Sequence, residues 1–197
     1  MMKREDMKKT QVILILCFLS VATVCTLQSQ ILPKNFQRLL QQTSMQYSVP
    51  PGFLPTPVIE NDDVAYDFAV KSTTRKLEIR YRIRPIEKQG QQDSYADPEF
   101  LFNGILMTMA LNISDGQLVE PKPFPEESVK SEFGADAGSF CAFRTDSEFG
   151  EGYEKCSMSA FHKDNVADAY VFYLFDDLKT LSEALLTDRV YHALKFR

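Results

Sequence analysis

The strongest constraint in this 197-residue sequence is an alternation of apolar and polar side chains in two neighbouring segments. Residues 64–70 and residues 77–83 each place apolar side chains at every second position. A period of two is typical of half-buried β-strands, and the polar residues 72–75 suit a turn. The pattern predicts an antiparallel hairpin with Thr73 and Thr74 at the centre of its turn.

Three arginines follow the polar side of the second strand: Arg80, Arg82 and Arg84. The predicted register places Asp67 opposite Arg80 and Asp63 opposite Arg84. Opposite charges across a strand pair contribute about 0.2–1 kcal/mol, so we interpret the row first as structural. The alternative is an anion-binding or partner-binding face made by the same arginines.

The remaining pattern predicts an antiparallel β-sheet with helices packed on its faces, which is an α/β fold of the α+β type. We expect one globular domain over residues 46–197, preceded by a linker or short helix over residues 30–45. The other predicted elements are a strand at 46–49, a helix at 100–111, a short helix at 125–133, strands at 139–144, 153–161 and 169–175, and a terminal helix from 178 to about 196.

The predicted helix over residues 100–111 is apolar nearly all round. Asp97 suits its N-cap and Pro98 its first position. Such a helix is expected to be mostly buried. Two alternatives are a partner-facing or lipid-facing helix and one wall of an apolar pocket. Its length of about twelve residues is too short to span a bilayer, which needs about 20.

The N-terminal residues 1–29 are typical of a signal peptide or an N-terminal anchor. A basic start, residues 1–9, precedes an apolar run over residues 12–27. Cys25, near the end of that run, is a candidate for lipidation, and the alternative is a small hydrophobic residue in a removed peptide. We therefore predict export, to the periplasm, the cell envelope or the medium.

The net charge of the whole chain is −5, and it becomes −7 without residues 1–29. An acidic domain is unsuited to nucleic acid or to anionic lipid. We expect a protein partner, no nucleic acid, and membrane contact through the N-terminal segment alone.

Two cysteines remain after export, Cys141 and Cys156. A hairpin centred near residues 148–149 makes them face each other, which predicts a disulfide in an oxidising compartment. The alternative is two buried free thiols.

The sequence carries none of the common catalytic motifs, so we predict no enzyme activity and no cofactor. His162 and His192 lack the spacing of metal ligands and are interpreted as surface or boundary residues. The acidic clusters at residues 60–63 and 146–151 are interpreted as solvated turns.

The element order resembles the PsbP-like fold, a group that includes photosystem accessory proteins and bacterial envelope lipoproteins of the DcrB type. The resemblance lies in residues 47–53 (YSVPPGF), in residues 170–173 (YVFY) and in the closing helix. The family often has Trp where Phe53 stands. The resemblance implies an α/β/α sandwich with a non-catalytic binding or assembly role, and it assigns no functional residue here.

These observations together predict an exported, non-catalytic binding or accessory protein of the cell envelope or extracellular space. The alternatives are a small-molecule carrier with an apolar pocket and a small hydrolase whose site has no sequence motif. A closed apolar cavity favours the carrier, and a convergent Ser, His and carboxylate favours the hydrolase. A shallow exposed apolar patch favours partner binding.

Overall fold

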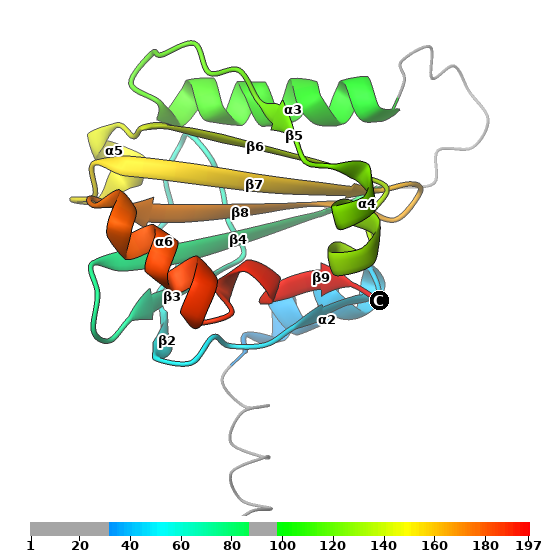
Figure 1. Cartoon of the computed structure of the whole chain (residues 1–197), viewed down its shortest axis with the longest axis horizontal. Coiled ribbons are helices and arrows are strands. Elements are labelled where there is room, and N and C mark those ends of the chain that lie inside the picture. The colour runs from blue at the N-terminus through cyan, green and yellow to red at the C-terminus, as the bar shows by residue number, and fades with distance from the viewer. Residues whose placement is uncertain (1–31, 87–97) are drawn as a thin grey trace, which may run out of the picture. The chain divides into compact units, whose positions relative to one another are not determined.

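The computed structural model describes residues 32–86 and 98–197. Within them, Asn35–Arg197 forms one compact unit. Its centre is a seven-stranded antiparallel sheet in the order β2-β3-β4-β8-β7-β6-β5 (Figure 1). The strands are β2 (Phe53–Thr56), β3 (Phe68–Ser72), β4 (Leu77–Pro85), β5 (Lys122–Pro123), β6 (Ala137–Arg144), β7 (Lys155–Lys163) and β8 (Ala167–Phe175).

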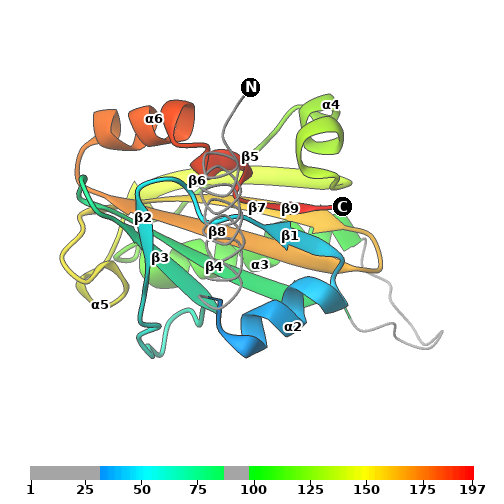
Figure 2. The same cartoon turned by 90° about the horizontal axis from the view of Figure 1, so that it is seen from below.

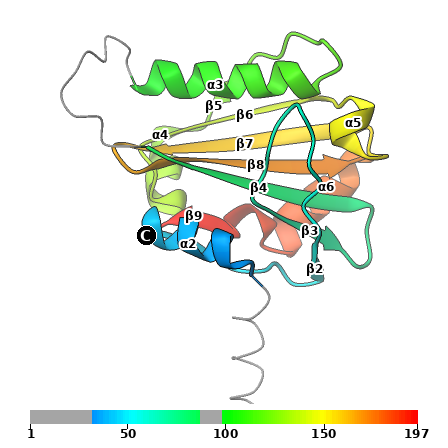
Figure 3. The ribbon, with the colours of Figure 1, turned by 180° about the vertical axis from the view of Figure 1, so that it is seen from behind.

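Helices cover both faces of this sheet, which confirms the predicted fold class. Helix α3 (Pro98–Ile113) lies along β6 and β7 on one face (Figures 1 and 3). The opposite face is covered by several shorter elements (Figure 2). These are α2 (Lys34–Gln42), α4 (Glu126–Ser128) with the π-helical turn Val129–Phe133, α6 (Leu178–Thr187), the 3-10 turn Val190–His192 and a small sheet of β1 (Met45–Tyr47) and β9 (Leu194–Phe196).

The predicted hairpin forms, but its register differs by two residues. Phe68 faces Tyr81, and Ala69 faces Arg80. The turn is displaced because its backbone is held from two sides: Thr73 N–H donates to the Gly52 carbonyl at 2.9 Å, and Ser72 Oγ accepts from Arg75 N–H at 3.2 Å. A shift of two keeps the side chains of β3 and β4 on their predicted faces, whereas a shift of one would invert them. Tyr66, which precedes β3, departs from the prediction, because its ring packs on Arg80.

The predicted terminal helix is wrong beyond residue 187. Helix α6 ends at Thr187, and Arg189 takes a left-handed φ of 55° that turns the chain. The last residues then form β9, whose Phe196 pairs with Met45 of β1. The strand β2 was also not predicted, because Pro55 lies within it; proline is tolerated there because β2 is an edge strand.

Candidate functional site

Helix α3 packs on the sheet through one face only. A single cluster holds the buried side chains of that face together with residues of β6, β7 and β8. The α3 members are Phe102, Leu106, Met109, Ala110 and Ile113. Their spacing of three and four residues is that of one helical stripe, so the opposite side of α3 is left without a packing partner in the described chain.

The outer face of α3 is exposed and apolar, which corrects the expectation of a mostly buried helix. We define this outer face as Leu101, Gly104, Met107, Thr108, Leu111 and Asn112, all of them exposed. Leu101 and Leu111 are each 47% exposed and Met107 is 42% exposed. Leu118, just after the helix, is 87% exposed. No charged residue occurs between Phe100 and Ser114, so the face is uncharged along its whole length.

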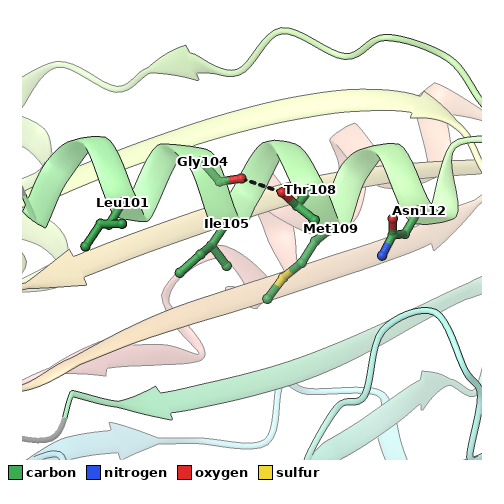
Figure 4. Close-up of a pocket in the computed structure, with 6 residues that line it drawn as sticks. All are labelled: Leu101, Gly104, Ile105, Thr108, Met109 and Asn112. Atoms are coloured by element: carbon green, nitrogen blue, oxygen red, sulfur yellow. Dashed lines mark hydrogen bonds between the residues drawn. The ribbon is translucent and has the colours of Figure 1, made fainter. Parts of the chain in front are cut away.

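A shallow groove follows one flank of this helix (Figure 4). Its lining residues are Leu101, Gly104, Ile105, Thr108, Met109 and Asn112, all from α3. Thr108 Oγ1 donates to the Gly104 carbonyl at 2.9 Å, so this hydroxyl is satisfied within the helix. A groove lined by one helix is an open surface, and it differs from the closed apolar cavity that a carrier would need.

Arg80, the first arginine of the predicted row, is buried at 1% exposure. Its guanidinium lies 4.8 Å from the ring centroids of both Tyr66 and Phe149. Its Nε donates to Glu78 at 2.7 Å and its Nη2 to Glu151 at 2.6 Å. The predicted partner Asp67 is wrong, since that carboxylate accepts from Ile83 N–H at 2.7 Å. A guanidinium enclosed in this way has no free edge for an external anion.

The other two arginines of the row have separate partners. Arg82 Nη1 donates to the Ala65 carbonyl at 3.2 Å. Arg84 pairs with Asp168 on the neighbouring strand β8, and not with the predicted Asp63. The three arginines therefore do not converge on one site, and the partner-binding alternative for them stays a prediction.

A buried polar cluster that was not predicted from the sequence surrounds Asp168. His162, predicted as a surface or boundary residue, is 3% exposed. Its Nδ1 lies 2.6 Å from Asp168 Oδ1 and its Nε2 lies 3.0 Å from Asp164 Oδ1. Tyr170 Oη donates to Asp168 Oδ2 at 3.3 Å, where Arg84 also binds. The cluster joins β4, β7 and β8 at one end of the sheet.

The charges in this cluster stabilise one another. The hydrogen bond to Asp168 raises the pKa of His162 above its ordinary value, against the opposing effect of burial. Burial alone would raise the pKa of Asp168, but hydrogen bonds from His162 and Arg84 outweigh it and lower that pKa. Both imidazole nitrogens of His162 face carboxylates, so neither is available to activate a serine. This geometry does not support the hydrolase alternative.

The predicted cysteine pairing is wrong in register. Cys141 faces Met158, and Cys156 faces Phe143. The reason lies in the connection, because the short helix α5 (Ser147–Gly150) and the left-handed Glu151 move the centre of the hairpin by one residue. Both thiols are free and buried, and burial raises the pKa of Cys141 to about 12. Diagonal neighbours lie roughly 7–8 Å apart between Cα atoms, beyond the usual span of a disulfide.

Other predictions fall partly outside the described residues. The segment 1–29, its Cys25 and the cap Asp97 lie there. Among residues 32–86 and 98–197, no helix is long and apolar enough to cross a membrane. The same residues contain no group of three or more His, Cys, Asp or Glu side chains placed to hold a metal ion.

The comparisons with known proteins include a remote structural likeness. No family model and no curated protein matches this chain. The chain is similar in structure to cyanobacterial PsbP (CyanoP) from Synechocystis sp. PCC 6803, known from a solution structure, with 12% identity and a TM-score of 0.48. The likeness covers 79% of this chain and 88% of that chain. The α/β/α sandwich is therefore established by the strands and helices described above, and family membership stays a prediction.

Proposed function

We propose that this chain is an exported accessory protein that acts by binding a protein partner through the outer face of α3. The observation that carries the proposal is the continuous, uncharged and exposed apolar surface over about three turns of that helix. Exposed apolar patches on monomeric proteins are usually small, and larger ones mark interaction surfaces. A few residues buried at the centre of an interface contribute most of its binding free energy.

Two further observations support a binding role over a catalytic one. The buried His162 is engaged with two carboxylates, and the buried Arg80 with two carboxylates and the Phe149 carbonyl. Their clusters contribute to the sheet and present no free nucleophile or base to solvent. The outer face of α3, in contrast, contains no group that could perform acid–base chemistry, so contact is the activity it supports.

The proposal of export rests on residues 1–29, with their basic start and apolar run. A lipid on Cys25 or a retained anchor would hold the domain at a membrane surface, and cleavage would release it. Mass spectrometry of the N-terminal peptide from fractionated cells distinguishes these forms. A cytosolic product that begins at Met1 would contradict export.

The binding role is tested by site-specific photocrosslinking in the native cells. A photoreactive amino acid at Met107 should capture a partner reproducibly, whereas the same group at Leu186 on α6 should not; Leu186 is 85% exposed and serves as the matched control. Adding Leu111→Glu to the Met107 probe should abolish capture, because it buries a charge in the contact. Equal capture from both positions, or capture unaffected by Leu111→Glu, would overturn the proposal.

A further inference from the structure

Gly104 lies in the middle of α3, where glycine weakens a helix. Internal packing does not explain it, because a Cβ at this position would meet nothing within 4 Å. Its φ is also not in the left-handed region that glycine alone adopts easily. The remaining physical use of a glycine here is to let another molecule approach the helix backbone closely.

The residues around Gly104 form a surface suited to such an approach. Thr108 lies one turn further on, and its hydroxyl is already bonded to the Gly104 carbonyl. Leu101 and Leu111 lie at the two ends, each about half exposed. The stripe therefore has two small residues at its centre and a large apolar residue at each end. If a second helix crosses α3 at Gly104 and Thr108, the two helix backbones come close there. The leucines at the two ends of the stripe then fill the space between the helices.

This stripe is symmetric about Leu106. Leu101 and Leu111 are each five positions from it, and Gly104 and Thr108 are each two positions from it. A two-fold axis across the helix therefore places Leu101 against Leu111 of a second copy and Gly104 against Thr108. Closed dimers are built from such self-complementary patches. Spacings of three, four and three residues occur in any helical stripe, so the self-complementarity lies in the residue types, a leucine at each end and a small residue at each central position.

Building on the proposed function, we propose that the partner of the outer face of α3 is a second copy of this chain, with the two helices antiparallel. The chain has a net charge of −5, so most of its surface opposes self-association, and this uncharged face is where two copies meet without repulsion. One pair of helices buries less than the roughly 1,200–2,000 Å² of a standard stable interface. The dimer is therefore reversible and forms more as concentration rises.

The orientation can be tested by disulfide crosslinking of full-length chains in the native cells. Two copies with different tags carry Leu101→Cys and Leu111→Cys respectively, and mild oxidation follows. The antiparallel dimer predicts at least tenfold more product from the mixed pair than from either variant with itself. In the antiparallel dimer, position 101 of one copy lies about 15 Å along the helix axis from position 101 of the other, given a rise of 1.5 Å per residue. The same holds for position 111, so neither variant crosslinks efficiently with itself. The unsubstituted chain measures the background from its native cysteines.

Gly104→Leu should lower the mixed-pair crosslink to background, because the leucine side chain keeps the second helix from approaching the backbone of α3. Thr108→Lys is the second variant, and circular dichroism identifies whichever of the two remains folded. A mixed pair no stronger than the like pairs, or a crosslink unaffected by the folded variant, would overturn the second-copy proposal. If the Met107 probe then still captures a different protein, the proposed function stands; if it captures nothing, both proposals fail.

Discussion

Helices α3 and α6 cover opposite faces of the same sheet, yet they meet solvent differently. Helix α6 exposes Leu178 and Leu186, but an ion pair of Lys179 and Glu183 shares its surface. Helix α3 exposes three large apolar side chains, Leu101, Met107 and Leu111, with no charge among them. Single exposed leucines are ordinary on protein surfaces, whereas a continuous uncharged face is not. The difference supports the proposal that α3 does more than cover the core.

The largest expected effect is the difference in the free energy of unfolding between substitutions on the two sides of α3. Leu106 is fully buried, so Leu106→Ala should lower the free energy of unfolding by about 2–5 kcal/mol. Leu111→Ala, the same change on the outer face, should alter it by less than about 0.5 kcal/mol. Urea unfolding of dilute protein measures both. Similar losses from the two variants would mean that the outer face also belongs to the core of the monomer.

The next largest effect is on the pH dependence of the free energy of unfolding, where His162 beneath α3 should differ from His192 after α6. The ring centroid of His162 lies 5.5 Å from that of Phe102 on α3, whereas His192 is exposed and bonds Glu132 at 2.8 Å. The pKa of His162 is raised by its hydrogen bond to Asp168, so protonated His162 stabilises the fold. That stabilisation is complete below about pH 6.5, the unfolded value, and is lost as pH rises through the folded pKa.

The measurement is the free energy of unfolding between pH 5 and pH 9, from urea curves. His162→Gln should remove the decline in stability across the upper part of this range, and His192→Gln is the matched control. The lowered pKa of Asp168 affects stability at acidic pH. The ionised carboxylate stabilises the fold above about pH 3.8, and this stabilisation is lost as pH falls through the folded pKa. An unchanged pH profile in His162→Gln would show that the imidazole is not a charged partner of Asp168.

A smaller effect, of opposite sign, is expected at Gly104. Gly104→Ala should raise the free energy of unfolding by about 0.5–1 kcal/mol, because it removes a mid-helix glycine without a clash. Ala184→Gly on α6, where Ala184 is fully buried, should lower it by at least a similar amount. Thermal unfolding of dilute protein checks both. A destabilising Gly104→Ala would mean that the monomer itself requires this glycine.

The residue pattern was sufficient to predict most of the sheet but not the ends of the chain. Strands β6, β7 and β8 begin and end within two residues of their predicted bounds, and β3 and β4 keep their predicted faces. The end of α6 could not be placed, because β9 exists only through its pairing with β1, some 150 residues earlier. Local periodicity contains no information about a partner so distant in sequence.

The sequence predicted the helix of the candidate site but not which of its faces is exposed. The helix over residues 100–111 was predicted, but a helix that is apolar all round does not indicate which face will pack. The contact between His162 and Asp168 could have been predicted from the sequence, because the turn after β7 places these two residues opposite each other. An imidazole and a carboxylate at facing positions beside a tight turn predict the hydrogen bond that the structure contains. Arg80 gave no such signal, since its partner Glu151 comes from a different hairpin.

The smallest expected effect concerns the strands beneath α3, and it is an absence of change. A disulfide closing about fifteen residues would contribute on the order of 3 kcal/mol. Because Cys141 and Cys156 are offset in register, adding a reductant should leave the urea midpoint of the domain unaltered. Without reductant, both thiols should resist alkylation in the folded protein, where burial raises their pKa, and both should react after unfolding. A reductant-dependent midpoint would instead show that the strands shift to bring the two sulfur atoms together, and α3 would then rest on a covalently fixed surface.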